Sequence, residues 1–219
     1  LKGFQHMGAE IERRERDYTI KTPRLQGEKL ILDYPSHTGT ENLLMAACLA
    51  DGVTYIENAS VEPEVVDLAS FLSAMGARIH GVGTNTIQVE GTGRLHGTVY
   101  RIMPDRMEAG TFALGALISG GDVTMGNAVA RWLGAITNKM REAGATVETD
   151  GDLYRVRAPE EIRATDIQTY PYPGFPTDLQ AQFMALMAVT PGVCVITDKV
   201  FPDRFIHIAE LNRMAASLR

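Results

Sequence analysis

The feature that most constrains this chain is a pattern that occurs three times along its sequence. Each copy reads as an apolar helix, a glycine at the helix end, a short β-branched strand and a polar residue that turns the chain. The corresponding glycines are Gly52, Gly121 and Gly192, and the corresponding strand ends are Asn58, Asn127 and Asp198. The period is about 70 residues, and a repeat of this length determines the architecture before any single element is assigned.

One complete unit is predicted between residues 29 and 90. It contains a strand at 30–32, an apolar helix, a strand at 53–56, a second helix that begins near Pro63, and a closing hairpin. The order is therefore β-α-β-α-β-β. The first helix of the unit is apolar on nearly every face, as is its counterpart in the second copy, and such helices are typical of buried positions. We therefore predict that the helices at 40–50 and 110–119 are buried on all sides.

The other copies are predicted to be incomplete or shifted versions of this unit. The second copy is expected to begin with a strand at 98–103, and the third with a strand at 166–169. The pair Asp150-Gly151 predicts a tight hairpin, because glycine accepts the positive φ of a two-residue turn.

The first residues read as the tail of an earlier repeat, and the last copy lacks its closing hairpin. We therefore expect an internal fragment with parts of two globular domains, residues 1–103 and 104–219.

Composition excludes several functional classes. A net charge of −6 argues against a general nucleic-acid surface. No apolar run approaches the roughly 20 residues of a membrane helix, so no membrane partner is expected. Cys48 and Cys194 have apolar neighbours and no metal-ligand spacing, which indicates buried, reduced thiols, no metal site and a cytoplasmic location.

The copies differ at the residues that enter the first helix. One copy has the hydroxyl-rich turn 36–40, which suits a phosphate but also suits a well-capped helix start. The third copy has Asp178 after Phe175 and two prolines, near Gln180 and Gln182. Asp178 is predicted either to cap a helix or to belong to a sugar site.

Several longer motifs resemble one family, the UDP-N-acetylglucosamine enolpyruvyl transferases (UDP-N-acetylglucosamine 1-carboxyvinyltransferases). They are FPTDLQAQF at 175–183, the pairs Val200-Phe201 and Arg204-Phe205, EPEVVDLASFLSAMGA at 62–77 and YRIMPDRMEAGTF at 100–112. The resemblance covers nearly the whole chain. It implies an inside-out α/β barrel of repeated β-α-β-α-β-β units in two domains. It also implies transfer of enolpyruvyl from phosphoenolpyruvate to the sugar 3′-hydroxyl with release of phosphate, the first committed step of peptidoglycan synthesis, without metal or organic cofactor.

The same resemblance implies roles for eight residues. Asp178 matches the residue that holds the acceptor hydroxyl and is the candidate base, and Thr177 would touch the reacting centre. Arg204 matches an arginine on the phosphoenolpyruvate side. The remaining matches are substrate-binding residues: Val200 and Phe201 for the UDP-sugar, and Ser36, His37 and Thr38 for the diphosphate. For His37, the alternative is a partly exposed turn histidine.

Some positions depart from the family pattern. Thr38 stands where glycine is usual, and Tyr34 stands where some members have lysine. The family's N-terminal Lys-Asn pair and its loop cysteine have no counterpart here, so the chain by itself is expected to be inactive. Two alternatives stay open: a non-catalytic paralogue that binds a nucleotide sugar, and another enolpyruvyl transferase such as the shikimate-pathway type. The FPTDLQAQ motif favours the UDP-N-acetylglucosamine enzyme.

Overall fold

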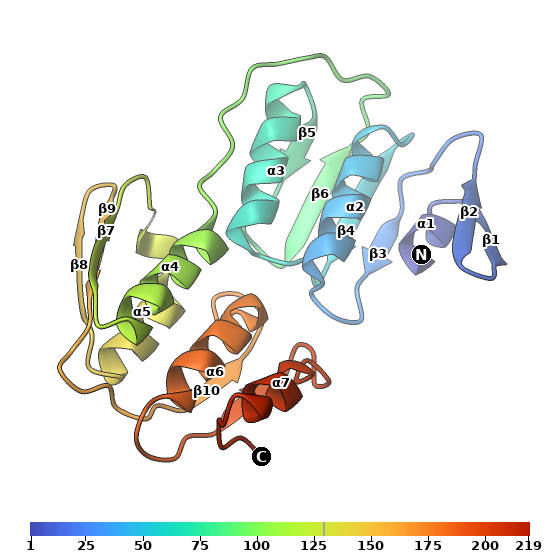
Figure 1. Cartoon of the computed structure of the whole chain (residues 1–219). Helices are drawn as coiled ribbons and strands as arrows, with labels where there is room; N and C mark the ends of the chain where they lie inside the picture. Colours follow the sequence, from blue (N-terminus) through green and yellow to red (C-terminus); the bar gives the residue numbers. More distant parts are fainter. Residues whose placement is uncertain (129) are drawn as a thin grey trace. The chain divides into compact units, whose positions relative to one another are not determined.

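The computed structural model describes residues 1–128 and 130–219. The chain divides into two compact units, unit 1 (Leu1–Met103) and unit 2 (Pro104–Arg219) (Figure 1). Each unit has its own hydrophobic core. The predicted assignment of residues 1–103 and 104–219 to parts of two enolpyruvyl transferase domains stays a prediction.

Unit 1 contains the predicted complete repeat. Its elements are α1 (Lys2–His6), β1 (Glu10–Arg14), β2 (Asp17–Lys21), β3 (Lys29–Ile31), α2 (His37–Cys48), β4 (Val53–Glu57), α3 (Pro63–Ala74), β5 (Arg78–His80) and β6 (Thr86–Glu90). From β3 onward the order is β-α-β-α-β-β, as predicted. The four strands form one sheet in the order β3-β4-β6-β5, in which only β3 and β4 run parallel. Helices α2 and α3 lie side by side over one face of this sheet (Figure 1).

The prediction that the first helix of each repeat is buried on all sides is wrong. Leu44 and Ala47 of α2 are fully buried against the sheet, but Met45 on the same helix is 43% exposed. In unit 2, helix α4 (Arg106–Ile118) likewise buries Leu114 and exposes 60% of Phe112. Among the described residues of each unit, the sheet covers one face of the helix only, so the apolar side chains opposite that face stay exposed.

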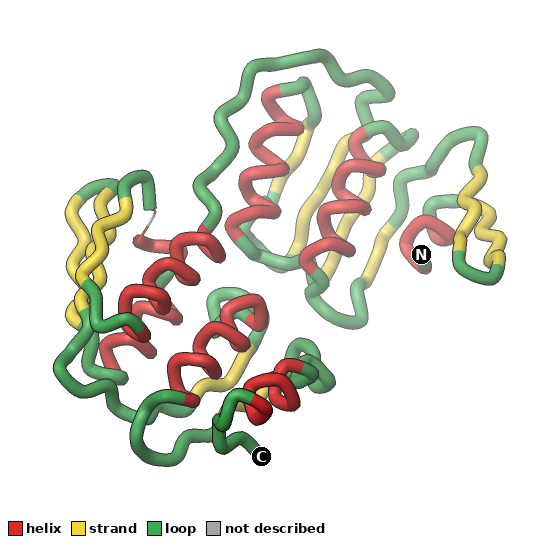
Figure 2. Tube along the Cα trace, viewed as in Figure 1, coloured by secondary structure: helices red, strands yellow, loops and turns green. Residues whose placement is uncertain are grey.

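The predicted strand at 98–103 is also absent. Residues 91–105 form a long loop, in which Val99 is fully exposed (Figure 2). This segment is held by α3 instead of by a strand. The Tyr100 hydroxyl donates to Asp67 Oδ1 at 2.9 Å, and its ring lies 5.1 Å from that of Phe71. A strand needs a partner for its backbone hydrogen bonds, and the neighbouring element here is a helix.

Unit 2 contains the other two copies. After α4 come β7 (Asp122–Met125), the 3₁₀ turn η1 (Ala130–Trp132), α5 (Gly134–Glu142), β8 (Thr146–Asp150), β9 (Leu153–Arg157), β10 (Ile167–Thr169), η2 (Thr177–Leu179), α6 (Gln180–Ala188), β11 (Ile196–Asp198) and α7 (His207–Arg213). The antiparallel sheet β7-β9-β8 repeats the order β4-β6-β5 of unit 1, and the parallel pair β10-β11 repeats β3-β4. The predicted hairpin at Asp150-Gly151 joins β8 to β9, and Gly151 has φ +57°.

Both cysteines are free thiols. Cys48 is fully buried in the core of unit 1, and burial raises the pKa of its thiol to about 11. Cys194 is only partly buried, so the prediction of a buried thiol is correct for Cys48 alone. Among the described residues, no helix has both the length and the apolar character needed to cross a bilayer.

Candidate functional site

The predicted reaction centre lies in unit 2, at the turn η2. Phe175, two residues before the turn, and Leu179, its last residue, are 4% and 0% exposed, and they anchor it in the core. Between them, the side chain of Asp178 is 59% exposed. The apolar residues of the FPTDL sequence at 175–179 therefore hold the turn in the core, and the carboxylate of Asp178 between them lies at the surface.

Four of the predicted site residues meet around this turn. The guanidinium Nη1 of Arg204 donates to Asp178 Oδ1 at 2.5 Å and to the Thr177 hydroxyl oxygen at 3.2 Å. The same guanidinium lies over the ring of Phe201, 5.0 Å from its centroid. Val200 directly precedes Phe201 in the loop. The structure thus brings together Thr177, Asp178, Phe201 and Arg204, which are separated by up to 27 residues.

Asp178 does not cap a helix. Neither η2 nor α6 has a side-chain hydrogen bond at its N-cap. The carboxylate is used instead in the ion pair with Arg204. Of the two interpretations that the sequence left open for this residue, the capping role is therefore contradicted.

Asp198, the last residue of β11, also belongs to this cluster and was not among the site residues predicted from the sequence. Its carboxylate is 5% exposed and accepts hydrogen bonds from the hydroxyls of Thr169 and Thr177 and from the backbone N–H groups of Val200 and Phe201. Burial by itself would raise the pKa of Asp198, but these four hydrogen bonds outweigh burial and lower the pKa below its ordinary value. The repeat had marked Asp198 only as a strand end.

The predicted diphosphate turn lies in unit 1. Ser36 is the N-cap of α2, and its hydroxyl accepts from the backbone N–H of Gly39 at 3.1 Å. A Cβ on Gly39 would lie 3.0 Å from this hydroxyl oxygen, so a larger residue there would press on the capping group. His37 and Thr38 follow in the first turn of the helix, where backbone N–H groups have no intrahelical acceptor. The structure therefore shows the cap, and diphosphate binding stays a prediction.

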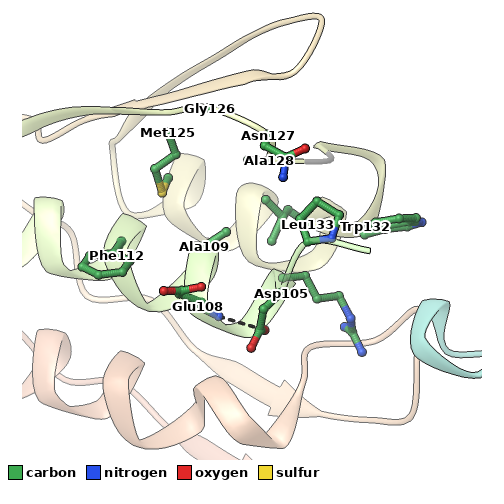
Figure 3. Close-up of a pocket in the computed structure, with 12 residues that line it drawn as sticks. Asp105, Glu108, Ala109, Phe112, Met125, Gly126, Asn127, Ala128, Trp132 and Leu133 are labelled. Atoms are coloured by element: carbon green, nitrogen blue, oxygen red, sulfur yellow. Dashed lines mark hydrogen bonds between the residues drawn. The ribbon is translucent and has the colours of Figure 1, made fainter. Parts of the chain in front are cut away.

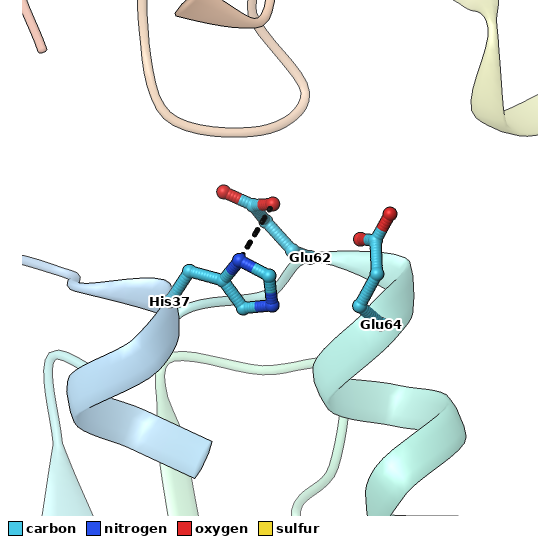
Figure 4. A group of neighbouring side chains, drawn as sticks. All are labelled: His37, Glu62 and Glu64. Carbon is cyan, nitrogen blue, oxygen red and sulfur yellow. Dashed lines mark ion pairs between the residues drawn. The ribbon is translucent and has the colours of Figure 1, made fainter. Parts of the chain in front are cut away.

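His37 is surrounded by carboxylates. Its Nε2 lies 3.0 Å from Glu41 Oε1, and its Nδ1 lies 3.7 Å from Glu62 Oε2. One ring nitrogen of His37 and one carboxylate oxygen each of Glu62 and Glu64 lie within 4.8 Å of one another, close enough to be ligands of one metal ion (Figure 4). Both ring nitrogens already face carboxylates, so contacts within the chain account for this arrangement. A diphosphate at the turn would meet these negative charges and would depend on hydroxyls and backbone N–H groups.

A pocket of about 260 Å³ lies elsewhere in unit 2, beside α4 (Figure 3). Phe112, Trp132 and Leu133 form much of its apolar wall, and Asp105 and Glu108 supply carboxylates. The Asp105 carboxylate accepts from the backbone N–H of Glu108 and therefore caps α4. None of the eight predicted site residues lines this pocket.

Gln180 follows the turn η2 and is fully buried. Neither its side-chain oxygen nor its side-chain nitrogen has a hydrogen-bond partner among the described residues. Leaving a buried amide unpaired costs about 1–3 kcal/mol. Gln180 is therefore a core residue beside the turn.

The chain is similar to known enzymes over its full length. It is 50% identical over 219 residues to the UDP-N-acetylglucosamine 1-carboxyvinyltransferase of Magnetococcus marinus, covering all of this chain and 52% of that protein. It is 49% identical over 221 residues to the UDP-N-acetylglucosamine 1-carboxyvinyltransferase 2 of Carboxydothermus hydrogenoformans, covering all of this chain and 53% of that protein. The chain thus spans about half the length of these curated relatives.

Solved structures show the same fold. The enolpyruvyl transferase NikO from Streptomyces tendae matches 96% of this chain and 53% of its own, with a TM-score of 0.84 and 19% identity. An EPSP synthase from Acinetobacter baumannii matches 97% of this chain and 51% of its own, with a TM-score of 0.64 and 23% identity. The predicted enolpyruvyl transferase fold is confirmed. The family model described as EPSP synthase (3-phosphoshikimate 1-carboxyvinyltransferase) matches residues 1–219, and the chain therefore belongs to that family.

Proposed function

We propose that the full-length protein transfers the enolpyruvyl group of phosphoenolpyruvate to the 3′-hydroxyl of UDP-N-acetylglucosamine and releases phosphate. The observation that carries this proposal is the exposed Asp178 carboxylate, held by Arg204 beside Thr177 and Phe201. Relatives at 49% and 50% identity, whose names state this activity, support it. The corresponding process is peptidoglycan synthesis for the cell wall, in the cytoplasm.

The proposed chemistry is an addition followed by an elimination. The sugar oxygen bonds to C2 of phosphoenolpyruvate while C3 takes up a proton. Loss of a proton from C3 and of phosphate from C2 then restores the double bond. A carboxylate within reach of the attacking hydroxyl accepts its proton, which is the role that we assign to Asp178.

Arg204 has a part in this scheme as a cation. Its Nη1 now pairs with Asp178 Oδ1. A phosphate or carboxylate group of phosphoenolpyruvate competes for the guanidinium, because charge-assisted pairs with such groups are strong. Binding of phosphoenolpyruvate would thus place the Arg204 guanidinium beside the departing phosphate. It would also free Asp178 Oδ1 to accept the proton of the sugar hydroxyl.

The UDP-sugar is assigned to the remaining residues. The ring of Phe201 is 53% exposed and offers an apolar surface to the sugar nucleotide. Val200 precedes it in the same loop, and both backbone N–H groups are held by Asp198. Ser36, His37 and Thr38 are assigned to the diphosphate.

The proposal is tested by replacing Asp178 with asparagine in the full-length protein. Asp178→Asn keeps the shape and a hydrogen-bonding group but removes the base, so turnover is expected to fall by roughly 10²-fold or more, with a much smaller change in sugar binding. The measurement is phosphate release from phosphoenolpyruvate with UDP-N-acetylglucosamine, together with calorimetric binding of the UDP-sugar. Near-normal turnover in the variant would remove Asp178 from the mechanism.

A second candidate function is the one in the family description, transfer to shikimate 3-phosphate. The same assay with that acceptor separates the two. Phosphate release with shikimate 3-phosphate and none with UDP-N-acetylglucosamine would replace the proposed function. Tight binding of the UDP-sugar without any release would identify the non-catalytic alternative.

A further inference from the structure

The buried carboxylate of Asp198 accepts four hydrogen bonds. Its Oδ1 accepts from the Thr169 hydroxyl at 2.8 Å and from the backbone N–H groups of Val200 and Phe201 at 2.9 and 2.7 Å. Its Oδ2 accepts from the Thr177 hydroxyl at 2.6 Å. One buried carboxylate therefore ties the loop after β11 to the turn that carries Asp178.

The bond to Thr177 also sets the direction of that hydroxyl. A threonine hydroxyl has one proton, and here it is donated to Asp198, so the oxygen is left to accept. It accepts from Nη1 of Arg204 at 3.2 Å, and the same nitrogen reaches Asp178. The orientation of the Arg204–Asp178 pair thus follows from the carboxylate of Asp198.

The backbone of the loop is held in a second way. The Thr169 hydroxyl donates to Asp198 and accepts from the backbone N–H of Lys199 at 3.1 Å. Thr169 is fully buried and pairs directly with Asp198 across the parallel strands β10 and β11. Three successive N–H groups, from Lys199 to Phe201, are therefore fixed by this pair of side chains.

The other copies of the repeat lack this arrangement. At the same position they have Asn58 and Asn127, both in the left-handed conformation with φ of +56° and +58°. The Asn58 amide donates to the carbonyl of Leu32, at the adjacent strand. A carboxylate has no proton to donate and gathers donors instead, so the third copy differs from the others in the chemistry of this residue as well as in its helix entrance.

We propose that Asp198 is a positioning residue of the acceptor site, which holds Val200, Phe201 and the Thr177 hydroxyl so that Asp178 and Arg204 face the substrates. This inference rests on the proposed function of the same site. Asp198 itself is buried and is not expected to touch either substrate.

The test is Asp198→Asn in the full-length protein. The amide oxygen can still accept, but the amide nitrogen faces the Thr177 hydroxyl and is a donor, so this hydroxyl can no longer donate its proton to residue 198. We expect kcat/KM for the UDP-sugar to fall by roughly 10- to 100-fold, because small displacements of positioning groups have effects of this size. In a double-mutant cycle, Asp198→Asn should add little to the loss caused by Thr177→Val, since both break the same contact.

Asp166 provides a matched control on the same strand pair. It is exposed, and its carboxylate accepts from the backbone N–H of Val195 at 2.7 Å, away from the loop. Asp166→Asn removes a carboxylate that supports the same sheet and should change kcat/KM by less than about twofold. If Asp198→Asn fails to fold, Thr169→Val removes one donor and is expected to give a smaller decrease in kcat/KM.

A readout that is independent of turnover separates this inference from the proposed function. In Asp198→Asn, the amide protons of Val200 and Phe201 should exchange with deuterium at least tenfold faster, whereas those of β4 should not change. A variant with normal kcat and KM, or with unchanged exchange at these two amides, would overturn the positioning role. Absence of turnover in the wild type together with the faster exchange would instead contradict only the proposed function.

Discussion

At the scale of single residues, two buried polar side chains near the turn η2 behave in opposite ways. Asp198 accepts four hydrogen bonds, whereas Gln180 has no partner among the described residues. A buried charge is tolerated only when donors replace its lost hydration. Asp198 meets this condition, and its ionised form is therefore part of the folded structure.

The buried, ionised carboxylate of Asp198 predicts that the stability of the fold depends on pH. The pKa of Asp198 is lowered in the folded state, so its contribution is fully present above the unfolded pKa of about 3.9 and is lost as pH falls toward the folded pKa. The free energy of unfolding of the wild type should exceed that of Asp198→Asn at pH 7, and the difference should shrink below about pH 4. Urea denaturation of both proteins between pH 3 and 7 measures it. A difference that stays constant over this range would show that folding does not lower the pKa of Asp198.

At the scale of elements, the N-terminus of α2 combines a visible structural role with a predicted binding role. The Ser36 hydroxyl caps the helix, and its backbone carbonyl accepts from both the N–H and the hydroxyl of Thr40. The Thr40 hydroxyl in turn accepts from the backbone N–H of Ser60, before α3. This start of the helix is therefore well ordered without any ligand.

Two substitutions at Ser36 separate capping from diphosphate binding. Ser36→Ala removes the cap and should lower the free energy of unfolding by about 1 kcal/mol. Ser36→Asp keeps a capping oxygen, so stability should remain, but it places a negative charge where the diphosphate is predicted. If the turn binds the diphosphate, KM for the UDP-sugar should rise strongly in Ser36→Asp. An unchanged KM in this variant would leave Ser36 with the capping role only.

At the scale of the whole molecule, the chain forms two units whose cores are separate sets of side chains. Residues 91–105, which include the end of unit 1 and the start of unit 2, contain no helix or strand. The Tyr100 hydroxyl donates a hydrogen bond to Asp67 of unit 1, but the neighbouring residues Val99 and Arg101 are exposed. Exposed loops without regular backbone hydrogen bonds are the preferred sites of proteolysis.

Limited proteolysis should therefore cut this segment first. Trypsin is expected to cleave after Arg94 or Arg101, both exposed, before it cleaves within the helices and sheets. Tyr100→Phe removes the hydrogen bond to Asp67 and should make the cut after Arg101 several-fold faster. Mass spectrometry of early digestion products identifies the sites. First cleavage outside residues 91–105 would contradict this account of the loop.

Much of the fold and part of the site could be predicted from the sequence. The repeat placed the β-α-β-α-β-β unit and its hairpins correctly, because glycine turns and apolar periodicity are local signals. The FPTD motif and Arg204 identified a cluster that the structure does bring together. The strand at 98–103 was wrong, since its apolar residues matched a strand pattern but no partner strand lies beside it. The diphosphate turn, with Ser36, His37 and Thr38, stays a prediction.

The sequence by itself determined most of the order of the elements, the family and most of the residues that carry the candidate chemistry. Only the tertiary structure decided which polar groups meet. Asp198 reads as an ordinary strand end, and its importance appears only when Thr169 and Thr177, more than 20 residues away, donate to it. The structure likewise decided that α2 and α4 are covered on one face, because burial depends on which sheet packs against a helix. Both outcomes depend on contacts between distant segments, and no local pattern in the chain encodes such contacts.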